Sequence, residues 1–219
     1  MMDLLEAIRA RHSVRQYLDK PLGDAEAAAL TGYIDTLNRG SGLHIQLVRN
    51  EPRAFDSRMA HYGNFTNVTS YFALVGPKAS VTAEKIGYYG EKLVLEAQRL
   101  GLNTGWVALT YKKIPDAFRV EKGEKLYIVI SVGYGATQGK PRPSKSAETL
   151  GGVDADSPEW YRSGVEAAML APTAINQQKF RFTRTGDTVT AKALLGTPQT
   201  KIDLGIAKCH FEIGSGYRF

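Results

Sequence analysis

The sequence is poor in cysteine, because Cys209 is the only one among its 219 residues. A single cysteine excludes an intrachain disulfide and any metal site built from several cysteines. The four histidines are scattered, and His210-x-Glu212, which is typical of a zinc deaminase helix, lacks the cysteine pair that such a site needs. We therefore predict no metal centre, and a reducing compartment, the cytoplasm, as the location.

Long apolar runs and blocks of like charge are also missing. The longest apolar run, Leu126–Val132, is far too short to span a bilayer. The first six residues carry acidic side chains where a signal peptide would need an apolar run. The net charge is +6, but the basic residues are scattered, so a basic nucleic-acid-binding domain is a weak alternative. We expect a soluble globular protein with no membrane partner and no nucleic-acid partner.

Phosphate-cradling loops of the common kinds are absent as well. No Gly-x-x-x-x-Gly-Lys loop and no Gly-x-Ser-x-Gly elbow occurs. Gly133-x-Gly135 follows a strand, but position 138 is Gln and Pro141-Arg142-Pro143 comes next where a dinucleotide fold would begin a helix. These departures exclude a Rossmann loop at this place.

The periodicity of apolar residues predicts a chain that contains both helices and strands. Asp24 is predicted to cap one helix, and Ser157 to cap another with Pro158 at its first position. The expected helices are 3–12, 25–37, 55–62, 83–100, 114–118, 157–170 and 202–213. The expected strands are 43–48, 71–76, 102–109, 125–132, 179–184 and 188–194. We predict that residues 144–156 form a linker.

A basic cluster follows the first helix. Arg11-His12-Ser13-x-Arg15 places two guanidinium groups, an imidazole and a hydroxyl within five residues. Such a group can bind a phosphate through charge-assisted hydrogen bonds. Lys140 and Arg142 alternate with prolines on a stiff segment and point the same way. The alternative is a solvated helix end and a solvated linker.

The stretch from Ala171 to Phe182 is a polar turn between an apolar helix and an alternating strand. Pro172 forces the chain to turn, and Thr173 and Asn176 favour turns because their side chains bond nearby backbone. A polar turn fixed between buried elements is a good place for a ligand. An ordinary helix-to-strand connection is the alternative.

The two parts of the chain, 1–150 and 151–219, resemble each other and predict one domain made of two half-repeats. In both, an Ala-rich helix leads through a polar break into an alternating strand. The matching pieces are Glu26–Leu30 with Glu166–Leu170, Gly90 with Gly205, and Gly101 with Gly216. The first part has the Arg11 cluster, the second has the Pro172 turn, and neither has both.

Taken together, these motifs resemble those of the nitroreductase family of FMN-dependent oxidoreductases. The resemblance implies FMN as cofactor, with its phosphate bound by Arg11, His12, Ser13, Arg15, Lys140 and Arg142. It implies backbone contacts to the flavin N5 edge from Gly105, Trp106, Val107 and Ala108, in Leu100-Gly101-Leu102-x-Thr104-Gly105-Trp106. It also implies flavin contacts from Pro172, Thr173, Ala174 and Asn176.

The fold that the resemblance implies is α+β, a three-layer α/β/α arrangement with mixed, mainly antiparallel sheets. Its two divergent halves would form a pseudo-dimer around one flavin. Family members carry the Pro-Ser-x-x-Asn segment soon after the Arg cluster, whereas here it lies in the second half, and Lys179 and Phe180 replace a Pro-Trp pair. A monomer is therefore favoured, and a homodimer is possible. Aromatic side chains such as Phe65, Tyr71 or Tyr111 would line a channel or, more simply, belong to the core.

The implied activity is a ping-pong cycle. NAD(P)H reduces FMN and leaves, and an electron-poor acceptor such as a nitroaromatic or a quinone then enters. Hydride chemistry belongs to the cofactor, so no catalytic side chain is named. The alternative is a flavin-binding protein of the same fold without turnover.

Overall fold

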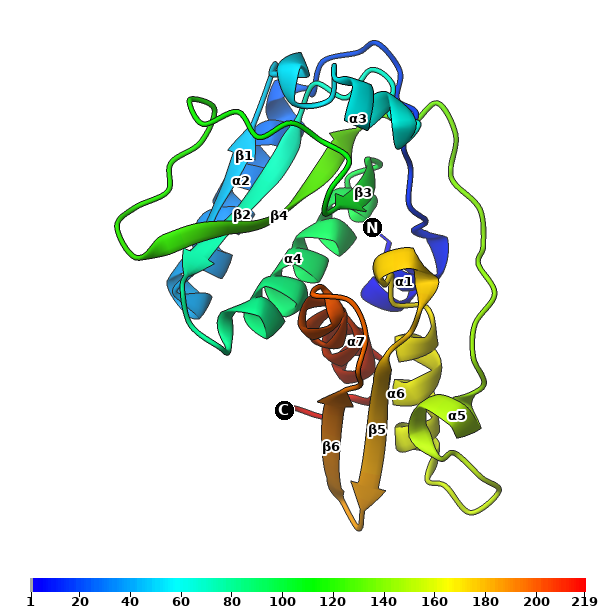
Figure 1. Ribbon diagram of the computed structural model, residues 1–219. Helices are drawn as coiled ribbons and strands as arrows, with labels where there is room; N and C mark the ends of the chain where they lie inside the picture. The colour runs from blue at the N-terminus through cyan, green and yellow to red at the C-terminus, as the bar shows by residue number, and fades with distance from the viewer. Residues whose placement is uncertain (1) are drawn as a thin grey trace. The chain divides into compact units, whose positions relative to one another are not determined.

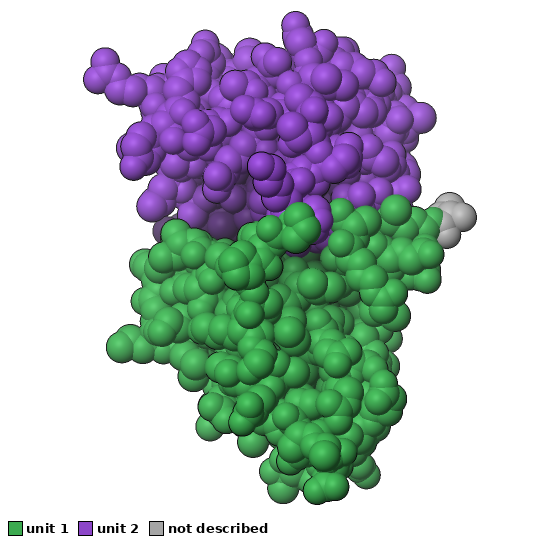
Figure 2. Space-filling view, turned by 90° about the vertical axis from the view of Figure 1, so that its right-hand side faces the viewer, with its two compact units in different colours: residues 1–10, 83–92, 141–219 green, residues 11–82, 93–140 purple. Residues whose placement is uncertain are grey.

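The computed structural model describes residues 2–219, and the chain divides into two compact units. Residues up to 10, 83–92 and 141–219 form one, which we call the helical unit; residues 11–82 and 93–140 form the other, the sheet unit (Figure 2). The helical unit therefore takes chain from both parts of the sequence, whereas the sheet unit lies wholly within the first part, 1–150. Among the described residues, no helix is both long and apolar enough to cross a membrane.

The sheet unit is built on a four-stranded antiparallel sheet in the order β1-β2-β4-β3 (Figure 1). Its strands are β1 (His44–Val48), β2 (Tyr71–Pro77), β3 (Asn103–Val107) and β4 (Glu124–Gly133). The central strand β2 is buried along almost its whole length, as its continuous apolar sequence requires. The predicted α+β class with antiparallel strands is confirmed.

Helix α2 (Asp24–Ser41) packs against β1 through its apolar stripe, which includes Leu30 and Ile34. The other face of the sheet carries Tyr71, which packs in one cluster with Phe55 and Phe65. The latter two come from the irregular region containing η1 (Pro52–Ala54) and α3 (Arg58–Tyr62). The core of this unit therefore lies on both faces of the sheet.

The helical unit contains helices and one hairpin. Its elements are α1 (Leu4–Ala10), α5 (Ala147–Gly151), α6 (Glu159–Met169), η2 (Ala174–Asn176), β5 (Phe180–Thr185), β6 (Thr188–Ala193) and α7 (Thr200–Ser215). The rings of Phe182 on β5 and Phe211 on α7 stack with centroids 4.6 Å apart, and Tyr161 on α6 meets Phe211 edge-on. These aromatic contacts join the hairpin to α6 and α7.

Helix α4 (Thr82–Arg99) contributes residues 83–92 to the helical unit, where it crosses α7 at two glycines. A Cβ atom on Gly87 would overlap the carbonyl oxygen of Ile202, and one on Gly205 would overlap that of Glu84. The contact is reciprocal, because Ile202 precedes Gly205 by the same three positions by which Glu84 precedes Gly87. Gly205 therefore meets α4 at the helical turn that contains Gly87.

Several predicted boundaries differ from the structure. Helix α2 continues past its predicted end at Leu37, because the Asn38 amide forms two 2.9 Å hydrogen bonds with the backbone of Ile45 instead of ending the helix. Residues 114–118 form turns and no helix, since Pro115 disfavours helical backbone at Ile114. Within the predicted linker, Ser146 caps the short helix α5.

The predicted helix caps are each displaced by one residue. Gly23, and not Asp24, is the N-cap of α2, and Asp24 is the first helical residue. Pro158, and not Ser157, is the N-cap of α6. Ser157 instead donates from its hydroxyl to Asp154 at 2.7 Å, within the connection before the helix.

Candidate functional site

The segment after α1 extends the edge of the sheet at β3. The Val14 N–H donates to the Thr104 carbonyl at 2.9 Å, and Ser13 bridges Thr104 in parallel orientation. A Cβ atom on Gly105 would lie 2.6 Å from the Val14 carbonyl oxygen, so only glycine permits this approach. The predicted phosphate residues 11–15 therefore lie beside the predicted flavin-edge residues 105–108.

Lys140 belongs to the same edge. Gly139 has φ +73°, and a Cβ atom there would lie 2.6 Å from the Cβ of His12 and 3.0 Å from the Ser13 carbonyl oxygen. The preceding chain is tied to β3, because the Asn103 side chain accepts from the Gly135 N–H at 2.9 Å. The turn thus delivers Lys140 next to the Arg11 cluster.

The side chains at this edge are basic and mostly exposed. Arg15, Ser13 and Lys140 are exposed, whereas Arg11 is only 4% exposed. Val107 is buried in the core, whereas Trp106 and Ala108 are half-buried. Guanidinium, ammonium and hydroxyl groups around backbone N–H groups form the donor set that phosphate requires.

The Pro172 turn lies in the helical unit and has an unusual backbone. Ile175 has φ +47°, Asn176 φ +55° and Gln178 φ +44°. A positive φ is rare for non-glycine residues and a genuine outlier for the β-branched Ile175. Such strain persists only where the surroundings fix it, and it concentrates at ligand-binding and switch regions.

Side-chain hydrogen bonds hold the turn against residues 142–145. The Asn176 side chain donates to the Pro143 carbonyl at 2.9 Å, and Arg142 donates to the Ala171 carbonyl at 3.4 Å. The buried Gln178 amide accepts from the Lys145 N–H at 2.8 Å, and Lys145 Nζ donates to the Gln178 carbonyl at 3.0 Å. Hydrogen bonds therefore join Arg142 and its neighbours directly to the Pro172 turn.

Asp203, on the first turn of α7, is a residue that the sequence analysis missed. It is 3% exposed and accepts from the Ala174 N–H at 3.1 Å and from the Gln177 side chain at 3.3 Å. Burial raises the pKa of its carboxyl to about 6, although both hydrogen bonds and the charge of Arg142 act in the opposite direction. An acidic group of unusual pKa thus supports the turn.

The predicted cofactor residues consequently fall into two sets, one in each unit. The edge set, in the sheet unit, is Arg11, His12, Ser13, Arg15, Gly105, Trp106, Val107, Ala108 and Lys140. The turn set, in the helical unit, is Arg142, Pro172, Thr173, Ala174 and Asn176. Within the described residues, no group of His, Cys, Asp and Glu side chains could hold a metal ion.

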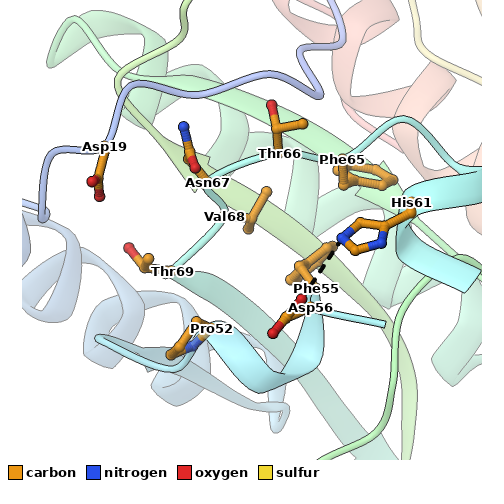
Figure 3. Close-up of a pocket in the computed structure, with 10 residues that line it drawn as sticks. All are labelled: Asp19, Pro52, Phe55, Asp56, His61, Phe65, Thr66, Asn67, Val68 and Thr69. Carbon is orange, nitrogen blue, oxygen red and sulfur yellow. Dashed lines mark ion pairs between the residues drawn. The ribbon is translucent and has the colours of Figure 1, made fainter. Parts of the chain in front are cut away.

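A cavity of about 490 Å³ lies in the sheet unit next to the Arg15 segment (Figure 3). Phe55, Phe65 and Val68 give it an apolar lining, and polar side chains surround them, among them Asp56 and His61, which lie 3.7 Å apart. The Thr66 N–H donates to the Arg15 carbonyl at 3.0 Å, so one wall of the cavity is hydrogen-bonded to the edge set.

Only one of the three aromatic residues considered for a channel lines this cavity. Phe65 does, and the Arg15 guanidinium carbon lies 5.9 Å from its ring centroid. Tyr71 is fully buried in the core, and its hydroxyl has no hydrogen-bond partner among the described residues. Tyr111 stacks on Phe55 from outside the lining.

Comparison with protein families gave one match, which covers nearly the whole chain. Residues 3–215 match the family model described as "Putative TM nitroreductase". A search of curated proteins found no match to the sequence.

Solved structures with the same fold include a "putative nitroreductase" from Thermotoga maritima MSB8. It has a TM-score of 0.71 and 23% identity, covering 97% of this chain and 83% of that one. A "putative nitroreductase" from Desulfovibrio desulfuricans, solved in complex with FMN, has a TM-score of 0.52 and 19% identity, covering 71% of this chain and 96% of that one. A "Putative NADH dehydrogenase/NAD(P)H nitroreductase" from Bacteroides thetaiotaomicron VPI-5482 has a TM-score of 0.50 and 19% identity, covering 67% of this chain and 95% of that one.

Proposed function

The chain belongs to the nitroreductase family whose model covers residues 3–215, and on this premise we propose that it is an FMN-dependent oxidoreductase. The electron donor is NAD(P)H, and the acceptor is a small electron-poor molecule such as a nitroaromatic or a quinone. The two are used in turn, in a ping-pong cycle. The observation that carries the proposal is the edge set, which gathers separate basic and glycine segments at one edge of the sheet.

The edge set fits the phosphate of FMN. Two close backbone approaches, at Gly105 and Gly139, place Ser13, Arg15 and Lys140 around one strand edge. The two glycines leave out the Cβ atoms that would push these segments apart. A dianionic phosphate is bound best by such a combination of fixed backbone and charged side chains.

FMN, when bound, supplies the hydride chemistry, and the protein binds, orients and tunes it. In our proposal, Arg11, Arg15 and Lys140 neutralise the phosphate, and the backbone of residues 105–108 approaches the flavin edge. We also propose flavin contacts from Pro172 and Asn176 of the turn set. No side chain of this chain is assigned a proton-transfer step.

FMN binding by an Arg15→Ala variant tests the assignment of the edge set. Arg15 is exposed, so the variant should fold, and losing one charge-assisted contact should raise the Kd for FMN about 10- to 100-fold. An Arg181→Ala variant is the matched control, because it removes one exposed charge from β5. Flavin fluorescence during titration measures both. Equal Kd values for the two variants would refute the phosphate assignment.

A second candidate function is flavin binding without turnover. Phe180, which stands where the family has Trp, is 1% exposed and packs against Phe182 with ring centroids 5.7 Å apart. The ring of Phe180 therefore packs in the core, and in this second candidate it makes no contact with a substrate. Reduction of the bound flavin by NAD(P)H separates this candidate from the first.

We also propose that the chain is internally duplicated. The reciprocal glycine contact between α4 and α7 supports this proposal, because reciprocity of this kind is characteristic of a two-fold relationship between equivalent segments. Both helices are followed by a glycine with positive φ, Gly101 and Gly216. A single chain would then contain what two chains provide in a homodimer.

A further inference from the structure

The carboxylate of Asp203 holds the strained part of the Pro172 turn at both ends. Its Oδ1 accepts from the Ala174 N–H, directly before Ile175, and its Oδ2 accepts from the side chain of Gln177, directly after Asn176. Ile175 and Asn176 are the adjacent residues with positive φ in this turn. The two oxygens of one buried side chain therefore bracket the outlier backbone.

This carboxylate does not serve its own helix. The N-cap of α7 is Gln199, and no side chain caps the helix. An acidic residue in the first turn of a helix is usually solvated or bonded to the free N–H groups of that helix. Both oxygens of Asp203 instead accept hydrogen bonds from a segment almost thirty residues earlier in the chain. Burying this charged group costs free energy, because the carboxylate loses its hydration.

We propose that Asp203 is the positioning residue of the turn set: its ionised carboxylate fixes the backbone of residues 174–177 for flavin contact, and its protonation releases one of the two bonds. The link to flavin contact rests on the proposed function. The statement about the two hydrogen bonds does not rest on it, because those bonds can be tested in the protein without flavin.

The loss of one hydrogen bond on protonation follows from the number of donors around the carboxyl group of Asp203. An ionised carboxylate accepts two hydrogen bonds, and both of its partners here, the Ala174 N–H and the Gln177 side-chain amide, are donors. A protonated carboxyl carries its own O–H donor on one oxygen, so that oxygen faces a donor and one bond is lost. The raised pKa of about 6 sets this change within the physiological range.

Two basic side chains, Arg142 and Lys145, flank the turn that Asp203 holds. Arg142, from the segment before α5, lowers the pKa of the carboxyl through its charge. Lys145 lies on the other flank of the turn, where its Nζ donates to the carbonyls of Gln177 at 2.8 Å and Gln178 at 3.0 Å. Burial outweighs the charge of Arg142, as the raised pKa of Asp203 shows.

Two substitutions separate hydrogen bonding from titration. Asp203→Asn mimics the protonated carboxyl at every pH, because it keeps an acceptor for the Ala174 N–H but places an amide donor opposite the Gln177 donor. The Gln177 side-chain N–H also donates to the Thr197 hydroxyl at 2.9 Å, which holds the Gln177 amide in its present orientation. Asp203→Ala removes both bonds. Asp187→Asn, at the exposed turn between β5 and β6, is the control with the same charge change.

The backbone amide resonance of Ala174 in the flavin-free protein tests the first part. We expect it to titrate with a midpoint near pH 6 in the wild type and in Asp187→Asn. It should stay constant with pH in Asp203→Asn and in Asp203→Ala. A wild-type resonance that does not titrate, or one that still titrates in Asp203→Asn, would overturn the proposal.

The Kd for FMN at pH 5 and pH 8 tests the second part. Because the phosphate of FMN itself titrates near pH 6, the readout is the ratio of the wild-type Kd to the Asp203→Asn Kd. Loss of one hydrogen bond to the turn should raise this ratio about fivefold to tenfold at pH 5 relative to pH 8. Bound FMN with an unchanged ratio would refute positioning by Asp203. A wild type that binds no FMN would refute the proposed function, while the amide titration would still decide the role of Asp203.

Discussion

At the scale of single residues, Asp203 makes the stability of the protein depend on pH. Its pKa of about 6 when folded lies above the usual value of 3.8. Between these values the folded state keeps a proton that the unfolded state releases, so stability falls as pH rises from about 4 to about 6 and then levels off. The buried charge therefore destabilises the folded protein at neutral pH.

Asp203→Asn should remove this dependence. Relative to the variant, we expect the wild type to lose about 3 kcal/mol of unfolding free energy between pH 4 and pH 7, since each pKa unit corresponds to about 1.4 kcal/mol. Denaturant unfolding at a series of pH values measures the difference, with Asp187→Asn as the control. Parallel curves for the wild type and Asp203→Asn would contradict the account.

His210 and Glu91 form a second buried polar contact in the helical unit, with 0% exposure of either side chain. Nδ1 of His210 lies 3.1 Å from the Ala167 carbonyl, which can only accept, so Nδ1 carries a proton. Nε2 lies 2.8 Å from Glu91, and the proton between them belongs to one partner or the other. Either way the pair is neutral overall.

Breaking this pair on one side should be costly. We expect His210→Leu to destabilise the protein by about 3–5 kcal/mol, because it leaves a carboxylate buried without this partner. The double variant His210→Leu, Glu91→Met should recover part of the loss, since the buried charge is then gone. A double-mutant cycle by denaturant unfolding measures the coupling, and simple additivity of the two changes would contradict it.

Some site residues could be predicted from sequence and others could not. The Arg11 cluster is visible because its members are neighbours in the chain, and the structure places Lys140 beside it. Asp203 gives no local signal, because its partners lie almost thirty residues away and an acidic residue near a helix start has an ordinary explanation. Positive φ at Ile175 contradicts the preference of its residue type and could not be foreseen.

At the scale of elements, the crossing of α4 and α7 depends on two glycines. Gly87→Ala or Gly205→Ala should destabilise the protein by about 3 kcal/mol, because each new methyl group meets backbone of the opposite helix, which cannot move aside as a side chain can. Thermal or denaturant unfolding measures the change.

Gly32→Ala is the matched control for this prediction. Gly32 lies within α2 and has nothing within 4 Å of a Cβ atom, so alanine there should stabilise the protein by about 0.5–1 kcal/mol. If the crossing variants behaved like Gly32→Ala, the close approach of α4 and α7 would be refuted.

Elements with strong periodicity were predictable, whereas short ones were not. The strand β4 and the helix α4 lie within one or two residues of their predicted bounds, because their apolar patterns are long and uninterrupted. The helix predicted at 114–118 is absent, because Pro115 disfavours helical backbone at Ile114. Helix α5 has five residues, too few for a periodic signal.

At the scale of the whole molecule, the α+β class and the family were accessible from sequence, but the division into units was not. Residues 83–92 and residues before 11 belong with 141–219, so the unit boundaries cut through α4 and through the predicted first half. Such a division depends on contacts between distant segments, which local patterns do not contain. The proposed half-repeats, 1–150 and 151–219, therefore do not coincide with the two compact units, and they concern the origin of the chain by duplication.

Internal duplication predicts that a single chain is sufficient. We expect the protein to elute as a monomer in size-exclusion chromatography and to bind one FMN per chain. Light scattering with flavin quantification after denaturation measures both quantities. An obligate homodimer would contradict this part of the proposal, because a second chain would then supply what the duplication is inferred to provide.

Anaerobic reduction tests the claim that this chain binds FMN and passes electrons through it. Protein loaded with FMN is mixed with NADH or NADPH without oxygen, and the visible absorbance of oxidised flavin is followed. We predict that this absorbance disappears with at least one of the two donors and returns when a nitroaromatic or a quinone is added. Flavin that stays oxidised with both donors, or a protein that binds no FMN, would contradict the claim.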